Sequence, residues 1–175
     1  SGPSPKKLEL ENLTGSMVKE LKDSGESPEN ITLIRNFAHL EGFYNHSTDS
    51  AISLLTRAIL MAGISNEDKA YCKMELADIF LFTGEVWEAT LLYQQVYQDY
   101  KNDVLGQEAK FKNTKLSFYI GEFMWARAQA DILKAATSKF IANDALALSL
   151  PIGDNLDPDS STVALEKYAR ADLLD

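Results

Sequence analysis

Alanines recur along the chain at nearly equal intervals. Four of them are separated by 38, 37 and 38 residues, and further small or apolar residues follow each one at the fourth and seventh positions. Residues at these spacings lie on one face of a helix, and a small first residue lets a neighbouring backbone come close. The four sets are Ala51, Leu55 and Ala58; Ala89, Tyr93 and Val96; Ala126, Ala130 and Leu133; and Ala164, Tyr168 and Ala171. This fixed period predicts a solenoid of repeated helices.

The composition is that of a folded helical protein. Of the 175 residues, 45% are hydrophobic and 25% are charged, so the chain can bury a sizeable core. No segment keeps an alternation of apolar and polar residues, and the predicted connections are short, which favours antiparallel helical neighbours. No apolar run is long enough to cross a bilayer. The expected class is all-α, with no direct membrane insertion.

Glycines, prolines and capping residues predict where the helices begin and end. Ser27 followed by Pro28 is a helix start, and Ser65 with Asp68 resembles a capping box. Pro151 is expected to stop the eighth helix, and a loop at 152–159 to precede the ninth. The first eight helices are expected at about 6–23, 28–45, 48–63, 66–84, 85–101, 104–121, 122–136 and 140–150, and the ninth is expected to carry Ala164, Leu165, Tyr168 and Leu173.

The expected organisation has four segments. Residues 1–7 (SGPSPKK) are expected to be disordered or a junction, without a signal peptide, and residues 8–26 to form an N-terminal helix. Three repeats are expected within 27–136, at about 30–64, 66–103 and 104–136. The helices of 137–175 are expected to form a cap or a partial repeat. The last helix fits either the second helix of a fourth repeat or the first helix of a further one.

The charge of the chain limits its partners. The net charge is −9 at pH 7, and the basic residues are scattered. Nucleic acids and anionic membrane surfaces both attract clustered Lys and Arg. We therefore expect no nucleic-acid partner, and basic or neutral protein partners instead. The sequence is compatible with either the cytoplasm or the periplasm as the compartment of the protein.

Residues suited to catalysis or to metal binding are sparse. Cys72 is the single cysteine and is expected to be a small buried apolar residue. His39 and His46, with Glu41 between them, lack the spacing of a zinc-binding helix. None of the usual catalytic or phosphate-binding motifs occurs. We expect no enzyme activity, no cofactor and no metal.

One acidic segment imitates a calcium-binding loop. Oxygen-bearing side chains occupy the first, third, fifth and twelfth positions of such a loop, namely Asn155, Asp157, Asp159 and Glu166. The sixth position, which should be glycine, is Ser160, and Pro158 stiffens the middle. We interpret the segment as the cap of the following helix.

The second repeat resembles the tetratricopeptide repeat family. The first helix of this repeat carries leucine, a small residue and an aromatic residue, at Leu76, Ala77 and Phe80. Gly84 is the turn glycine, and the second helix carries Glu88, Ala89 and the aromatic Tyr93, as in the family pattern. The segments GEVWEA at 84–89 and GEFMWA at 121–126 are near copies of each other. The resemblance covers about residues 30–136 and is closest to bacterial members of the family, with three to four degenerate repeats.

Two repeats depart from the family pattern. The third keeps Gly121, Ala126, Ala130 and Leu133 but has polar residues at Asn113, Thr114 and Ser117, where the family prefers leucine, a small residue and tyrosine. The first has His46 at the turn-glycine position and Gly42 at the aromatic position. The closing proline of the family is missing from all three.

The resemblance implies a right-handed superhelix whose first helices line a concave groove for a peptide or protein. The candidate groove residues, transferred by register, are Asn36, Leu40, Phe43, Tyr44, Met74, Asp78, Leu81, Phe82, Phe111, Lys115, Phe118 and Tyr119. For each residue the alternative is packing between helices. Members that clamp a C-terminal carboxylate use Lys, Asn, Lys and Arg at the four positions held here by Asn36, Leu40, Glu108 and Lys112, respectively. The resemblance therefore does not imply a carboxylate clamp.

The expected function is that of a non-catalytic scaffold that binds a protein or peptide partner. The alternative is a structural or regulatory domain of a larger chain that carries an enzyme or an envelope anchor elsewhere. An open groove would favour the scaffold, whereas a groove filled by the chain's own helices, the first or the eighth, would favour the alternative. Self-association through an exposed terminal face is compatible with both.

Overall fold

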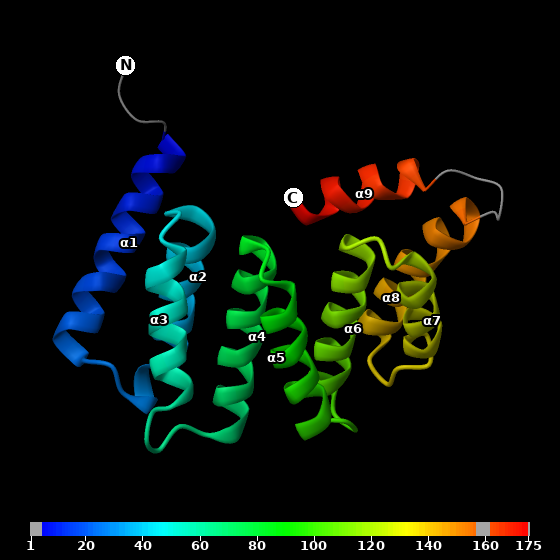
Figure 1. Cartoon of the computed structure of the whole chain (residues 1–175). Helices are drawn as coiled ribbons and strands as arrows, with labels where there is room; N and C mark the ends of the chain where they lie inside the picture. Colours follow the sequence, from blue (N-terminus) through cyan, green and yellow to red (C-terminus); the bar gives the residue numbers. More distant parts are fainter. Residues whose placement is uncertain (1–4, 157–161, 175) are drawn as a thin grey trace. The chain divides into compact units, whose positions relative to one another are not determined.

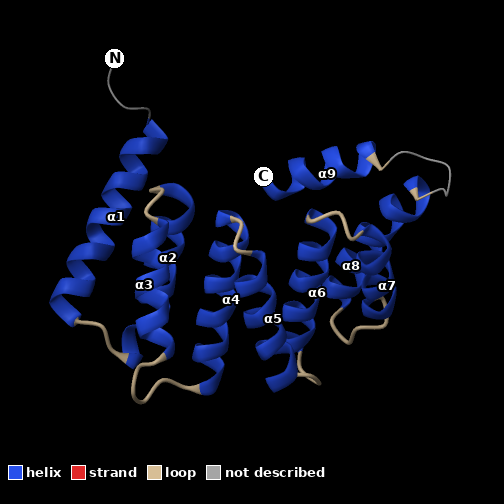
Figure 2. Cartoon of the chain, viewed as in Figure 1, coloured by secondary structure: helices blue, strands red, loops and turns tan. Residues whose placement is uncertain are grey.

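The computed structural model describes residues 5–156 and 162–174, and within these residues it contains helices and loops but no strand (Figures 1 and 2). The class is all-α, as expected. The chain divides into two compact units, Ser1–Thr83 and Gly84–Asp175, which we call unit 1 and unit 2. Each unit is described by itself. Among the described residues, no helix is both long enough and apolar enough to cross a membrane.

From residue 5 onward, unit 1 contains four α-helices, with α2 packed against α1, α3 and α4. They are α1 (Pro5–Ser24), α2 (Ile31–His39), α3 (Thr48–Ile59) and α4 (Asn66–Thr83). A 3-10 turn η1 (Pro28–Asn30) precedes α2, and a π-helix η2 (Leu40–Tyr44) extends it. Together they match the expected second helix. Helix α1 begins at Pro5, inside the segment expected to be a junction, and α3 ends at Ile59, before the expected stop at Gly63.

The capping box that opens α4 is confirmed. The Asp68 backbone N–H donates to Ser65 Oγ at 3.0 Å, and Ser65 Oγ donates to Asp68 Oδ2 at 2.6 Å. Cys72, in the second turn of this helix, is fully buried, and burial raises the pKa of its thiol to about 11. The cysteine is therefore a core residue, as expected.

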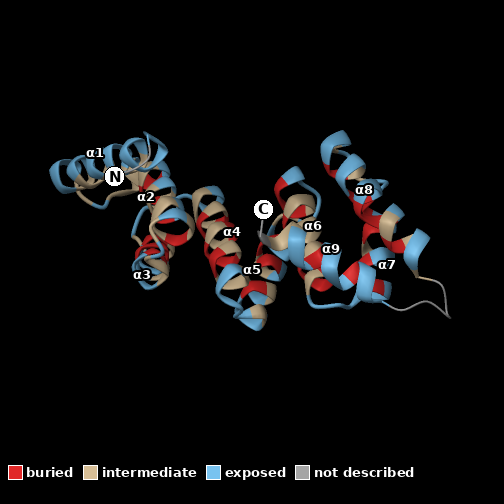
Figure 3. Cartoon of the chain, turned by 90° about the horizontal axis from the view of Figure 1, so that it is seen from above, coloured by how far each residue is buried: buried red, intermediate tan, exposed pale blue. Residues whose placement is uncertain are grey.

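Within its described residues, unit 2 contains five helices, and each of them carries buried residues (Figure 3). They are α5 (Val86–Asp99), α6 (Val104–Tyr119), α7 (Phe123–Leu133), α8 (Lys139–Asn155) and α9 (Val163–Leu174). Each helix from α5 to α8 packs against the next one, and α9 packs against α6 and α8. Its core includes Phe118, Phe123, Ala126, Ala130 and Ile152.

The alanine pattern holds for three sets and fails for the fourth. The residues of the first three sets are all buried. In α9, by contrast, Ala164 and Ala171 are exposed and Tyr168 is 48% exposed. Between Val163 and Leu173, the buried residues of α9 are Leu165 and Ala169. The fourth set was wrong because α9 docks on α6 and α8 through a face shifted by one residue from the alanine pattern.

Pro151 does not stop α8, contrary to expectation. The helix continues to Asn155, whose side-chain Nδ2 donates to the Pro151 carbonyl oxygen at 2.8 Å. Ile152, the next residue, is completely buried in the core of unit 2. Burial of this side chain outweighs the backbone hydrogen bond that proline cannot make. Asp157 and Asp159, which the sequence assigns to the cap of the ninth helix in preference to a calcium loop, lie outside the described residues.

Three turns share an unusual backbone conformation. Gly84 and Gly121 have φ angles of 90° and 85°, and His46 at the corresponding position of the first repeat has a φ of 56°. Residues other than glycine rarely adopt this left-handed region. The turn position therefore has a left-handed backbone conformation in all three repeats, including the first, where His46 replaces glycine.

Candidate functional site

The candidate groove residues differ in exposure and are divided between the two units. Met74 and Phe118 are buried in the core, so the packing interpretation holds for both. Asn36, Tyr44 and Phe82 are exposed. The remaining candidates are half-buried: Leu40, Phe43, Asp78, Leu81, Phe111, Lys115 and Tyr119. Of the accessible candidates, Phe43, Tyr44 and Phe82 belong to an aromatic cluster in unit 1, and Phe111 and Lys115 line a cavity in unit 2.

The surface in unit 1 is an aromatic cluster of His39, Phe43, Tyr44 and Phe82. The Phe43 and Phe82 rings meet edge to face with centroids 5.3 Å apart. The His39 ring lies 4.8 Å from the Phe43 ring and 5.9 Å from the Tyr44 ring. Tyr44 is 56% exposed and Phe82 is 43% exposed. The sequence placed three of these four residues in the groove and missed the contribution of His39.

His39 is oriented by a carboxylate of α4. Its Nδ1 lies 2.7 Å from Glu75 Oε1 on α4, and the imidazole is about half exposed. No group of three metal-ligating side chains occurs among the described residues. The contact holds one ring edge toward α4, so the imidazole face is available to the aromatic cluster.

A π-helical turn and a glycine build the surface in unit 1. The Asn45 backbone N–H donates to the Leu40 carbonyl at 2.9 Å, which is the wide spacing of a π-helix. Gly42 is buried in this turn, where a Cβ atom would lie 3.0 Å from Ile79 Cδ1 of α4. The absence of a side chain allows η2 to approach α4. This approach brings Phe43 to Phe82, and it gives a reason for glycine at the family's aromatic position.

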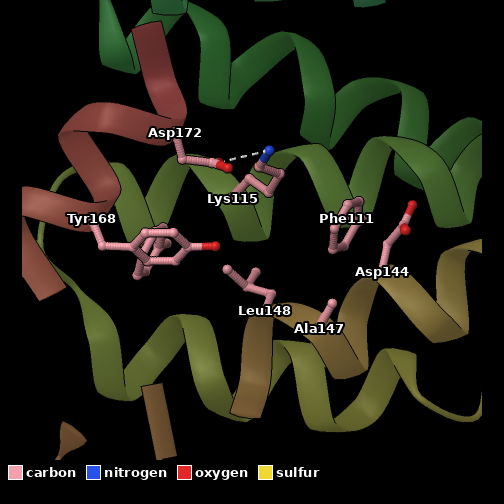
Figure 4. Close-up of a pocket in the computed structure, with 8 residues that line it drawn as sticks. Phe111, Lys115, Asp144, Ala147, Leu148, Tyr168 and Asp172 are labelled. Atoms are coloured by element: carbon pink, nitrogen blue, oxygen red, sulfur yellow. Dashed lines mark ion pairs between the residues drawn. The ribbon is translucent and has the colours of Figure 1, made fainter. Parts of the chain in front are cut away.

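The surface in unit 2 contains a cavity of about 280 Å³ between α6, α8 and α9 (Figure 4). Tyr168 and Asp172 of α9 lie opposite Lys115 of α6 and Leu148 of α8. Phe111, Phe118, Asp144 and Ala147 complete the lining. The cavity is therefore shaped in part by α9, which the sequence had not placed in the groove.

Helix α9 contacts three of the four candidate groove residues of unit 2. Lys115 Nζ pairs with Asp172 Oδ2 at 2.9 Å, and Tyr119 Oη donates to the same oxygen at 2.7 Å. The Phe118 and Tyr168 rings meet edge to face at 5.8 Å. Burial raises the pKa of Asp172, but the hydrogen bonds from Tyr119 and Lys115 outweigh it, so the net pKa is lowered.

The sequence contained a signal for this contact that the alanine pattern concealed. Leu165, Tyr168, Ala169 and Asp172 follow one another at helical spacing, and all four contribute to the docked side of α9. Ala164 lies one position before Leu165 and continues the alanine period, so the period predicted the wrong buried face for α9. The helical face formed by Leu165, Tyr168, Ala169 and Asp172 ends in a carboxylate, and this pattern could have identified Asp172 as the partner of Lys115.

The two surfaces offer aromatic rings, an imidazole with its carboxylate, and an ammonium–carboxylate pair. Such groups suit binding of a side chain or a helix that presents apolar area with a few hydrogen-bonding groups. Comparisons of the chain with models of protein families, with curated proteins and with solved structures found no match.

Proposed function

We propose that this chain is a non-catalytic scaffold of the tetratricopeptide type that binds a protein or peptide through the first helices of its repeats. Two features support a repeat architecture. Three sets of alanine-led residues are buried at the same positions, and three turns share a left-handed residue. In this proposal the solenoid serves as a rigid support for surface aromatic side chains.

The exposed aromatic cluster of unit 1 is the observation that carries the proposal. Tyr44 and Phe82 expose large apolar rings beside Phe43, although burying these rings would be favourable. Contiguous aromatic surface of this kind is typical of protein interaction sites, in which a few aromatic residues supply most of the binding energy. Removing one such ring typically costs about 1–2 kcal/mol or more of binding free energy.

A second candidate function is a structural or regulatory domain, and α9 favours it. In unit 2, the chain's own helix contacts Lys115, Phe118 and Tyr119, which are the side chains that the scaffold proposal assigns to a partner. A groove occupied in this way is what the alternative anticipates, although the occupant is the ninth helix rather than the first or eighth. The two candidates are compatible if unit 1 binds the partner.

The test compares partner capture by three forms of the chain. The full chain, a Tyr44→Ala/Phe82→Ala variant and a Leu60→Ala control are immobilised and exposed to extract of the source cells. Leu60 is 79% exposed at the end of α3 and belongs to neither surface. We expect a protein retained by the wild type and the control to be lost with the double variant. Circular dichroism confirms that the three forms are equally helical.

Two results would contradict the scaffold proposal. Equal retention of every captured protein by the double variant would show that the aromatic cluster does not bind partners. Retention that also disappears with Leu60→Ala would indicate non-specific adhesion of apolar surface. Loss of capture with a Lys115→Ala variant alone would instead move the partner to unit 2 and favour regulation by α9.

A further inference from the structure

Helix α9 contacts α6 and α8 as a helical ligand contacts a groove. Leu165 and Ala169 are buried in the core of unit 2, and Tyr168 and Asp172 line the cavity between α6, α8 and α9. These four residues stand at positions i, i+3, i+4 and i+7, which are the positions that anchor an amphipathic helix in the groove of another protein. We call the surface that they cover the α9 site, and it includes Lys115, Phe118 and Tyr119 of α6 and Leu148 of α8.

Helix α9 is attached to unit 2 through a small contact. Each of the helices α5 to α8 packs along the next one, whereas α9 runs crosswise to α6 (Figure 1). Within 163–173, its buried residues are Leu165 and Ala169. The side chains of the Lys115–Asp172 pair are 33% and 32% exposed. An isolated helix of 12 residues is marginal in water, so α9 can separate and unfold while α5 to α8 keep their mutual packing.

The α9 site is wider than α9 itself. A cavity of about 280 Å³ remains beside the helix, with Tyr168 and Asp172 of α9 on one side and Phe111 and Asp144 on the other (Figure 4). Matched protein surfaces leave few voids larger than a water molecule. Phe111 is half-buried and Asp144 is exposed, so α9 leaves both accessible. A helix with a larger side chain at the position of Tyr168 would fill more of the cavity and cover Phe111.

The covalent connection of α9 restricts which helix can replace it. A tethered segment competes at an effective concentration that is on the order of millimolar for a short linker. The α9 of a second copy carries the same side chains without this advantage, so it would not displace the α9 already bound. A partner helix displaces α9 when it keeps the four anchors and also fills the cavity. The expected occupant is therefore a helix of another protein.

Two side chains of α6 set the charge of the last anchor. Lys115 Nζ lies 2.9 Å from Asp172 Oδ2, and Tyr119 Oη donates a hydrogen bond to the same oxygen at 2.7 Å. An ammonium has donors and no acceptor, and hydrogen bonds to an ionised acceptor are the stronger ones. A helix with an apolar residue in place of Asp172 would leave the half-buried Lys115 and Tyr119 without this acceptor. The partner helix must therefore carry Asp or Glu at its last anchor.

We propose that the α9 site binds an amphipathic helix of a partner protein, with apolar, aromatic, small and acidic residues at its four anchors, and that this helix displaces α9. The inference rests on the proposed function, in which the first helices of the repeats bind a protein or peptide, and it names the partner's chemistry at α6. Because the partner binds chains in which α9 is undocked, its apparent Kd is the intrinsic Kd divided by the undocked fraction. Release of α9 is therefore the step that regulates binding.

The experiment uses a fluorescein-labelled peptide of residues 162–174 as the first probe. Fluorescence anisotropy measures its binding to the full wild-type chain and to Asp172→Ala, in which the internal helix is loosened. The undocked fraction of the variant should rise about five- to thirtyfold, and its apparent affinity for the probe should rise by the same factor. A second probe carries Tyr168→Trp, which fills more of the cavity, and should bind at least about threefold tighter than the first.

Substitutions of α6 in the Asp172→Ala chain test the last anchor. Lys115→Ala should weaken binding of the first probe by about tenfold, because the probe's carboxylate loses the ammonium. Lys110→Ala is the matched control, since Lys110 Nζ lies over the Tyr97 ring of α5, and it should bind the probe as the Asp172→Ala chain does. Lys115→Glu should reject the first probe and bind a probe that carries Asp172→Lys. Circular dichroism confirms that the α6 variants are as helical as the Asp172→Ala chain.

Several results would overturn the inference. They are no saturable binding of either probe to Asp172→Ala up to about 1 mM, equal affinity of the two probes, and an unchanged probe preference of Lys115→Glu. A wild-type dimer that the first probe dissociates would assign the site to the α9 of a second copy and would overturn the partner assignment. Failure of the scaffold proposal is separable, because Tyr44→Ala/Phe82→Ala alters unit 1 and should bind the probes as the wild type does.

Discussion

At the scale of single residues, some glycines of this chain are needed because a side chain would clash with a neighbouring group, and not only because glycine has a flexible backbone. Gly106, in the first turn of α6, is buried, and a Cβ atom there would overlap the Tyr100 carbonyl oxygen. Gly15, in the middle of α1, has no atom within 4 Å of an added Cβ. The same substitution should therefore have opposite effects at the two sites.

Gly106→Ala is expected to destabilise the chain by about 1–3 kcal/mol, because the new methyl group must displace backbone atoms. Gly15→Ala is expected to stabilise α1 by about 0.5–1 kcal/mol, because alanine has the higher helix propensity and the site is open. Urea unfolding of both variants and the wild type gives the two differences. A destabilising Gly15→Ala, or a neutral Gly106→Ala, would show that the local packing around these helices differs from that described.

His46 offers a second residue-level prediction. Its φ of 56° imposes strain that glycine at the equivalent Gly84 and Gly121 avoids. His46→Gly is expected to raise the free energy of unfolding by roughly 1 kcal/mol, and His46→Val to lower it. Thermal unfolding of His46→Gly, His46→Val and the wild type shows whether each substitution raises or lowers the free energy of unfolding. If His46→Gly lowers stability, the histidine side chain makes a compensating contact.

At the scale of secondary-structure elements, α9 is held by a carboxylate that bridges two side chains of α6. Asp172 accepts a hydrogen bond from Tyr119 and pairs with Lys115, and its pKa is lowered below the ordinary aspartate value. Such a group stabilises docking above its unfolded pKa of about 3.9, and the contribution is lost as the pH falls through the folded value. Docking of α9 should therefore be complete at neutral pH and weaken below about pH 4.

Asp172→Ala is expected to loosen α9 at neutral pH. The pair is about one third exposed, so the loss is put at roughly 1–2 kcal/mol after allowance for solvent screening, or about a five- to thirtyfold rise in the undocked fraction. Trypsin cleavage at Lys167 and Arg170, both within α9, reports this fraction. Asp144→Asn, which changes a carboxylate of the same cavity outside α9, is the matched control. Equal cleavage of Asp172→Ala and wild type would show that the carboxylate does not hold the helix.

Much of the element structure could be predicted, and the exceptions share a cause. Helix ends set by local chemistry, such as the Ser65–Asp68 box and the stop at Gly84, follow from neighbours in the sequence. Pro151 and the face of α9 were mispredicted because burial of Ile152, Leu165 and Ala169 depends on helices distant in the sequence. The aromatic cluster was predicted in part from the sequence and depends in part on a contact with a distant helix. Register gave Phe43, Tyr44 and Phe82, while His39 joined them through the contact of Glu75 on another helix.

At the scale of the whole molecule, net charge and exposed apolar surface act against each other. Trp87, Met124 and Phe140 are among several large apolar side chains exposed by more than half, which favours association. The charge of −9 at pH 7 opposes it by repulsion between copies. The isoelectric point is about 4.7, so the repulsion vanishes at a pH where the folded pKa of Asp172 still leaves α9 docked.

We therefore expect the chain to be monomeric at pH 7 and low salt and to associate as the pH approaches about 4.7. Because the attraction is apolar, the Tyr44→Ala/Phe82→Ala variant should associate less than the wild type at pH 4.7, although its charge is the same. Sedimentation velocity at pH 7.0, 5.5 and 4.7, with helicity followed in parallel, separates association from unfolding. A sedimentation coefficient that stays constant down to pH 4.7 would show that repulsion is not what keeps the copies apart. Equal association of the variant and the wild type would instead place the adhesive surface outside the aromatic cluster of unit 1.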